Sequence, residues 1–291
     1  MPHAQINDIT LYYEETGDGA PIVFCHEFAG DYRSWQPQVE AFSGTHRCIT
    51  YSHRGYLPSD VPEELDAYTQ DLLVEDLRGL LDHLDIERSH IVGLSMGGNV
   101  ALNFALTYPE RCLTTVVAGC GSGTVGREQF ERDNDRVVGY LRTHGMAAFA
   151  DMYAGGAARL TFQRKDPAGW ELFRQQLAEH SAIGSAFAQA GIIRRRPTIF
   201  ALKERLNQLT VPTLLVVGDE DEPCIEPGVF MKREIATSGL VILPQSGHTL
   251  NLEEPARFNQ AVADFHAAVD AGHWATRDEV TVSWLPPDVR T

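Results

Sequence analysis

The stretch His90-Ile91-Val92-Gly93-Leu94-Ser95-Met96-Gly97-Gly98 decides the fold of this 291-residue chain. The run from His90 to Leu94 is typical of a buried strand, and an apolar helix is predicted over 96–107, directly after Ser95. Between them, Gly93 to Gly97 matches the pattern G-x-S-x-G. Small residues let a strand and a helix approach closely, so we expect Ser95 on a sharp, strained turn beside the positive end of a helix dipole. Ser95 is therefore a candidate nucleophile; the alternative is a glycine-rich phosphate loop or a plain tight turn.

Outward from this stretch, strand-like and helix-like segments alternate along most of the chain. Ile9, Leu11 and Tyr13 alternate with more polar positions, as in an edge strand. The pattern predicts further strands over 21–25, 48–51, 114–118, 211–217 and 240–243, and helices over 68–84 and 254–268. Such alternation indicates an α/β fold, a mostly parallel sheet flanked by helices, with the strand carboxyl ends along the edge where ligands bind.

The alternation is interrupted once, which suggests a division of the chain. We expect a core domain from residues 1–122 and 207–271, and a helical cap, or lid, inserted at residues 123–206. Residues 272–291 form a polar C-terminal tail, which is either mobile or held to the surface by Trp274 and Trp284.

Two later loops offer partners for Ser95. The predicted strand over 211–217 runs into the acidic segment Asp219 to Glu222, and the strand over 240–243 leads to a loop containing His248. A serine nucleophile needs a base, and that base needs an orienting acid. Because both loops follow strand carboxyl ends, both side chains can converge on Ser95 in the order serine, acid, histidine. Taken singly, His248 and the acidic run could each be solvated loop residues.

Four motifs together carry a family resemblance. They are His26 to Gly30, Arg54-Gly55-Tyr56 with Ser59-Asp60, Gly93 to Gly98, and the loops at Gly218 and His248. In these motifs the chain resembles the α/β-hydrolase superfamily, in the branch of small lid-bearing esterases, enol-lactonases and carbon–carbon hydrolases. The resemblance covers about residues 6 to 270 and is weakest in the lid. It implies an α/β-hydrolase fold with a helical lid and no cofactor.

The resemblance also implies roles for individual residues. In the family the acid usually lies three residues after the strand-ending glycine, which selects Asp221, with Asp219 second. The backbone N–H groups of Met96 and Phe28 would then form the oxyanion hole. Glu27 stands where the family usually has glycine, and two interpretations of it remain open. Its carboxylate either braces the loop through hydrogen bonds or contacts a cationic or hydrogen-bonding part of the substrate.

The activity implied is hydrolysis of a carboxylic ester or lactone of a small organic substrate (EC 3.1.1) through an acyl-enzyme on Ser95. A carbon–carbon hydrolase of a dioxo acid, or an acyltransferase, would use the same residues, and a ligand receptor without catalysis is a further alternative. In the lid, Trp170 either packs or lines an apolar pocket. Arg195, within Arg194-Arg195-Arg196, either forms surface ion pairs or binds a substrate carboxylate.

Composition restricts the partners further. The formal net charge of -16 opposes binding to nucleic acid or to an anionic membrane. Five scattered cysteines favour a reducing, cytoplasmic setting. We expect no metal, because His26, His46 and His53 are dispersed and no H-E-x-x-H motif is present. The N-terminal residues have no signal-peptide pattern, and a homodimer remains open.

Overall fold

The computed structural model describes residues 2–277, and these residues form an eight-stranded sheet in the order β1-β2-β4-β3-β5-β6-β7-β8. The β1–β2 and β2–β4 pairs are antiparallel and all the others are parallel. The predicted α/β fold with a mostly parallel sheet is confirmed. The strands are β1 (His3–Ile6), β2 (Ile9–Thr16), β3 (Ala20–Cys25), β4 (His46–Tyr51), β5 (Ser89–Leu94), β6 (Cys112–Ala118), β7 (Thr213–Gly218) and β8 (Ser238–Leu243).

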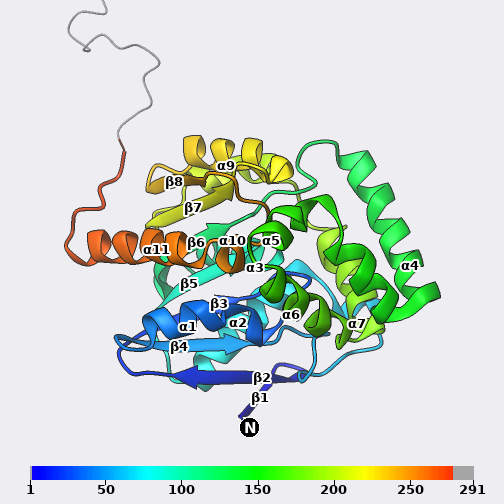
Figure 1. Cartoon of the computed structure of the whole chain (residues 1–291). Helices are drawn as coiled ribbons and strands as arrows, with labels where there is room; N and C mark the ends of the chain where they lie inside the picture. Colours follow the sequence, from blue (N-terminus) through cyan, green and yellow to red (C-terminus); the bar gives the residue numbers. More distant parts are fainter. Residues whose placement is uncertain (1, 278–291) are drawn as a thin grey trace, which may run out of the picture.

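Helices cover both faces of the sheet (Figure 1). One face packs against α1 (Gln36–Phe42) and α11 (Pro255–Asp270), and the other against α2 (Gln70–His83), α3 (Met96–Thr107) and α9 (Glu222–Glu234). The central strands β5 and β7 are buried along their whole length. Continuous apolar strands between two helical layers are what a parallel sheet requires, because both of its faces must be covered. The short helix α10 (Leu250–Glu253) precedes α11.

The segment between β6 and β7 is helical and groups at one end of the sheet in Figure 1. Its first helix, α4, is interrupted at Gly145, which has φ 74° and ψ -178°. The elements of this segment are α4 (Arg127–Ala154), η4 (Ala157–Arg159), α5 (Leu160–Lys165), α6 (Pro167–Ala178), α7 (Ala182–Phe187), η5 (Ala188–Ile193), η6 (Phe200–Leu202) and α8 (Lys203–Asn207). Shorter turns elsewhere are η1 (Tyr32–Trp35), η2 (Leu65–Ala67) and η3 (Pro109–Arg111).

One strand assignment was wrong in position. The segment containing Ile9, Leu11 and Tyr13 forms β2, which lies between β1 and β4 and is therefore not an edge strand. The edge belongs to β1, whose four residues are too few to show a clear alternation.

The start of the predicted tail is fixed to the core. Trp274 donates an indole N–H bond to the carbonyl of Thr237 at 2.8 Å and packs edge-on against Phe265 with ring centroids 4.6 Å apart. Trp284 and the rest of the tail from 278 onward lie outside the described residues. Among residues 2–277 no helix is both long and apolar enough to cross a membrane.

Candidate active site

Ser95 stands on the turn between β5 and α3, in the conformation that its sequence context predicts. Its backbone has φ 56° and ψ -109°, a left-handed and strained region for a residue with a side chain. The close approach of strand and helix depends on glycine. A Cβ at Gly93 would lie 2.1 Å from the carbonyl oxygen of Gly97, and a Cβ at Gly97 would lie 2.0 Å from that of Cys25. The turn therefore holds the half-buried Ser95 hydroxyl at the carboxyl edge of the sheet.

His248 and Asp221 complete a hydrogen-bonded chain that ends at Ser95. The Nε2 atom of His248 lies 2.8 Å from Ser95 Oγ, and its Nδ1 atom lies 2.8 Å from Asp221 Oδ2. A carboxylate only accepts, so Nδ1–H donates to Asp221, and Nε2 is left to accept from the serine hydroxyl. The structure thus brings together the three residues predicted from sequence.

The environment of Asp221 favours its ionised form. Burial alone would raise the pKa of this carboxyl group, but the charge of His248 and the hydrogen bond from it outweigh burial and hold the pKa below its ordinary value. Asp219, the second candidate acid, has a different role. Its Oδ1 accepts the backbone N–H of Ser246 at 3.0 Å, which braces the loop that carries His248.

The loop after β3 is organised by a buried neutral histidine. The backbone N–H of His53 donates to His26 Nε2 at 2.9 Å, so the proton of the ring lies on Nδ1, which donates to the carbonyl of Glu27 at 2.7 Å. Burial lowers the pKa of His26 to about 4, which keeps the ring neutral. This bond fixes the backbone that leads to Phe28, and Gly97 packs against the carbonyls of Cys25 and His26. The start of α3, with Met96, and the loop with Phe28 therefore lie side by side.

Glu27 forms a buried ion pair with a residue that the sequence did not single out. Its Oε2 atom lies 2.6 Å from Nη2 of Arg159, and the two side chains are 2% and 1% exposed. Burial alone would lower the pKa of Arg159, but the charge of Glu27, together with smaller contributions from Tyr153, Asp221 and Glu253, raises that pKa above its ordinary value. The guanidinium also lies over the rings of Tyr153 and Phe173, 5.2 and 5.4 Å from their centroids. The negative charge beside the candidate oxyanion hole is thus paired.

The segment that contains Arg159, residues 157–165, also contacts the loop of His248. The backbone N–H of His248 donates to the carbonyl of Ala158 at 3.3 Å. Next to it, Thr161 donates to the buried carboxylate of Glu253, which also accepts the backbone N–H of Gly247. Segment 157–165 therefore contacts both sides of the site, the loop after β3 through Arg159 and the histidine loop through Ala158 and Thr161.

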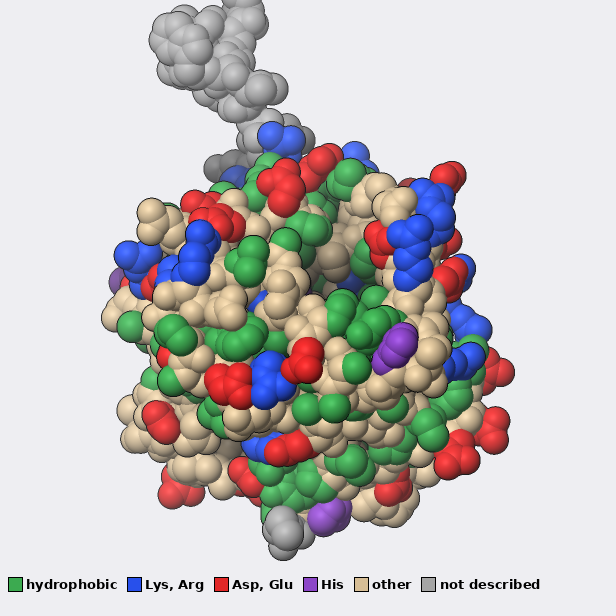
Figure 2. Space-filling model, turned by 45° about the vertical axis from the view of Figure 1, so that its right-hand side comes forward, with side chains coloured by type: hydrophobic (Ala, Val, Ile, Leu, Met, Phe, Trp, Pro, Cys, Tyr) green, Lys and Arg blue, Asp and Glu red, His purple; other side chains and the backbone are tan. Residues whose placement is uncertain are grey.

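The remaining predicted substrate-binding residues, Arg195 and Trp170, contact other protein groups. The side chain of Arg195 is 48% exposed, and its Nη1 atom lies 3.5 Å from Oδ1 of Asp66. Trp170 is half-buried and donates its indole N–H to the carbonyl of Ala154 at 2.8 Å, within the helical segment. Arg196 is buried and donates to Ser122. On the face in Figure 2, basic side chains lie next to acidic ones. Ion pairs of the helical segment join Arg132 with Glu128, Arg136 with Asp133 and Arg194 with Asp135.

The expectation that His26, His46 and His53 are dispersed was wrong for His26 and His53, whereas His46 does lie apart from both. His26 and His53 pack against each other with ring centroids 4.3 Å apart. His46 lies near His90 and His266, at the opposite end of the sheet from Ser95. Residues far apart in sequence meet here because parallel strands bring their amino ends to one edge.

Comparisons with known proteins identify the family and the fold. Residues 20–255 match a family model described as "alpha/beta hydrolase fold". The chain is 30% identical over 253 residues to 3-oxoadipate enol-lactonase 1 of Acinetobacter baylyi, across 85% of this chain and 89% of that protein. It is 27% identical to the putative 2-succinyl-6-hydroxy-2,4-cyclohexadiene-1-carboxylate synthase of Bacillus subtilis, across 85% and 90%. Among solved structures, a thermophilic esterase from Thermogutta terrifontis is similar with a TM-score of 0.83 and 28% identity, across 92% of this chain and 99% of that one.

Proposed function

The chain belongs to the alpha/beta hydrolase family, and from this premise we propose that it is a serine hydrolase that cleaves a carboxylic ester or lactone of a small organic substrate through an acyl-enzyme on Ser95. The observation that carries the proposal is the unbroken hydrogen-bonded chain from Ser95 Oγ through both nitrogens of His248 to Asp221. Such a chain removes the hydroxyl proton as the oxygen attacks.

In the first step Ser95 Oγ attacks the substrate carbonyl and its proton passes to His248 Nε2. The imidazolium that forms is stabilised by the ionised Asp221, whose pKa is held below its ordinary value. The same proton then passes to the leaving oxygen, the carbon–oxygen bond breaks, and the acyl group stays on Ser95. In a lactone the leaving oxygen remains attached to the acyl chain.

In the second step a water molecule replaces the leaving group. His248 takes a proton from this water, the hydroxide attacks the acyl carbon, and the proton returns to Ser95 Oγ as the acid departs. The negative charge on the carbonyl oxygen is stabilised in both steps by the N–H groups of Phe28 and Met96, on the adjacent loop and helix start. The pairing of Glu27 with Arg159 supports this role, because an unpaired carboxylate would oppose charge development.

The lid proposed from sequence, residues 123–206, would control access to this site. Its segment 157–165 contacts the loops of Glu27 and His248, which supports a role in shaping the pocket. The relatives support an ester or lactone as the substrate class, since two of the three named above are a lactonase and an esterase. Five free, buried cysteines support the proposed cytoplasmic setting.

The test is Ser95→Ala with a chromogenic short-chain ester. We expect kcat to fall on the order of 10⁶-fold while the melting temperature stays near that of the wild type. A fluorophosphonate probe should add one mass increment to the wild type and none to the variant. The matched control is Ser89→Ala on the same strand, a buried serine whose hydroxyl has no hydrogen-bond partner within residues 2–277.

Ser89→Ala should retain activity and labelling. Turnover of the ester by Ser95→Ala at the wild-type rate would overturn the proposal. A dioxo acid in the same assay measures the carbon–carbon alternative, and cleavage of that acid but of no ester or lactone would replace the proposed substrate class.

A further inference from the structure

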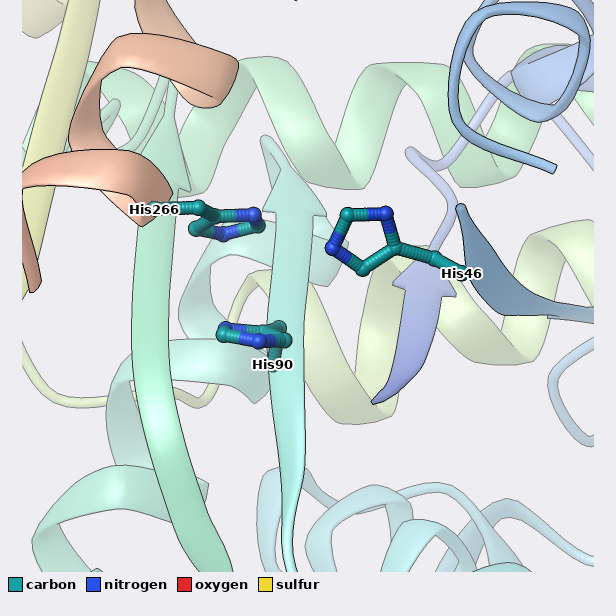
Figure 3. A group of neighbouring side chains, drawn as sticks. All are labelled: His46, His90 and His266. Atoms are coloured by element: carbon teal, nitrogen blue, oxygen red, sulfur yellow. The ribbon is translucent and has the colours of Figure 1, made fainter. Parts of the chain in front are cut away.

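Three histidines meet at the amino end of the sheet, away from Ser95. His46 is the first residue of β4, His90 is the second residue of β5, and His266 lies in the last two turns of α11. One ring nitrogen from each lies within 4.8 Å of the other two. Figure 3 shows the three rings around a common space, with β4, β5 and α11 each supplying one of them.

The hydrogen bonds of these rings leave nitrogens free to bind a ligand. The Nδ1 atoms of His46 and His90 lie 2.8 Å from the hydroxyls of Thr45 and Thr114. A threonine hydroxyl that accepts from Nδ1–H leaves the lone pair on Nε2. His266 is only 3% exposed, and neither of its nitrogens has a hydrogen-bond partner among the described residues. Because buried polar groups are normally hydrogen-bonded, these nitrogens are candidates to bind a ligand.

The surroundings favour a cation over an anion as that ligand. His90 and His266 are each only 3% exposed, and imidazole in its neutral form is a common metal ligand in proteins. The exposed Asp270, one turn after His266, adds negative potential at His90, whereas Arg88 opposes it. His46 is half-buried and connects the cluster to solvent.

We propose that His46, His90 and His266 bind one Zn²⁺ ion. Imidazole nitrogens suit Zn²⁺, and three protein ligands leave the fourth tetrahedral position for water, on the solvent side near His46. Zn–N bonds of about 2.0–2.1 Å place tetrahedral ligand atoms about 3.4 Å apart. The rings of His90 and His266 stack with centroids 4.1 Å apart and an interplanar angle of 29°, so they must turn about their Cβ–Cγ bonds to aim at a shared ion.

Bound Zn²⁺ would tie two strands to the last helix. The hydroxyls of Thr45 and Thr114 match the outer contacts that orient ligating histidines. The ion would stabilise the fold by mass action, because the unfolded chain does not hold these residues together. This inference does not depend on the chemistry proposed for Ser95.

The experiment is a calorimetric titration of metal-stripped protein with ZnCl₂, together with thermal melts. We expect one Zn²⁺ per chain and a higher melting temperature with the metal. His266→Phe keeps an aromatic ring in the stack but removes both nitrogens, so Zn²⁺ affinity should fall at least about a hundredfold, while the metal-free melting temperature stays the same or rises. His273→Ala, an exposed histidine just beyond α11, is the matched control and should bind like the wild type.

A second possible metal group must be separated from this one, because Asp221, Cys224 and His248 also place ligand atoms within 4.8 Å of one another. His248→Ala should keep the Zn²⁺ affinity, and the Co²⁺ derivative of the wild type should show ligand-field bands without sulfur-to-cobalt charge transfer. Failure of the wild type to bind Zn²⁺ would overturn the proposal, as would binding that survives His266→Phe and disappears in His248→Ala.

Discussion

Histidine side chains gather at both ends of strand β5, and the two groups differ in how many of their ring nitrogens have hydrogen-bond partners. At the carboxyl end, both nitrogens of His248 have partners within 2.8 Å, namely Ser95 and Asp221. At the amino end, His90 has a partner for Nδ1, and His266 has none among the described residues. A preorganised site is complete before its substrate arrives, whereas the amino end has buried ring nitrogens without a hydrogen-bond partner among the described residues. We therefore expect substitutions near Ser95 to leave Zn²⁺ affinity unchanged, and substitutions in the histidine cluster to leave ester hydrolysis unchanged.

Asp221→Asn should give the largest effect after loss of the nucleophile itself. An amide in place of the carboxylate favours the wrong tautomer of His248, so we expect kcat for the chromogenic ester to fall about 10⁴-fold with little change in melting temperature. Zn²⁺ affinity should be unchanged, because the histidine cluster lies at the other end of β5.

The matched control is Asp219→Asn, which keeps an oxygen able to accept from the N–H of Ser246. It should lower kcat less than about tenfold, a small part of the range seen for acid–base groups. A larger loss in Asp219→Asn than in Asp221→Asn would show that the acid has been assigned to the wrong residue.

Glu27→Gln should mainly change stability. It leaves the buried guanidinium of Arg159 without its charge partner, and breaking a buried pair in this way costs about 3–5 kcal/mol in the free energy of unfolding. Urea unfolding measures this difference. Glu179→Gln is the control, because Glu179 is 61% exposed and its pairing with Arg33 is worth about 1 kcal/mol or less.

The double variant Glu27→Gln/Arg159→Met removes both charges and should recover part of the lost stability. A single Glu27→Gln variant within about 1 kcal/mol of the wild type would contradict the view that this ion pair holds segment 157–165 against the loop after β3.

The pH dependence of the free energy of unfolding reports on one buried histidine at each end of the sheet, His26 and His266. The pKa of His26 is about 4 in the folded chain and near 6.5 in the unfolded chain. Between these values the unfolded state binds more protons, so the free energy of unfolding decreases as pH falls from 6.5 to 4, by about 3 kcal/mol for this group. His26→Gln should remove that part of the slope in urea unfolding measured at several pH values.

His266→Phe, at the amino end of the sheet, should likewise reduce the dependence of the free energy of unfolding on pH, since burial also lowers the pKa of His266. His144→Gln, at an exposed position on α4, should leave the slope unchanged. An unaltered slope in His26→Gln would mean that His26 is not the buried neutral group that organises the loop.

Local patterns predicted the carboxyl end of the sheet well. The predicted helix over 96–107 coincides with α3, and the turn at Ser95 follows from glycines within three residues of it. The helix α9 was not predicted, because Pro223 and Pro227 obscure its pattern, although proline is tolerated in the first turn. Hydrophobic periodicity therefore identifies helices and strands whose own residues favour that structure, and it misses those that depend on tertiary packing.

Long-range pairs could not be predicted in the same way. Arg159 and Glu27 are 132 residues apart, and neither has a local pattern that announces the other. His46, His90 and His266 come together only because β4 and β5 start at the same edge and α11 returns to it. An isolated histidine in a sequence does not show whether it is a metal ligand or a buried core residue. The cluster of His46, His90 and His266 could therefore be identified only from the three-dimensional structure.

Thr114→Val is the smallest and sharpest test of the amino end. It removes the hydroxyl that holds Nδ1 of His90 while keeping a β-branched side chain of similar shape in β6. Loss of such an outer contact weakens metal binding about ten- to a hundredfold, so we expect that shift in the dissociation constant for Zn²⁺ with kcat unchanged. The control is Thr115→Val on the next residue, whose hydroxyl donates instead to the carbonyl of Ala101 at 3.4 Å. Equal Zn²⁺ affinities in the two variants would mean that Thr114 does not orient a metal ligand.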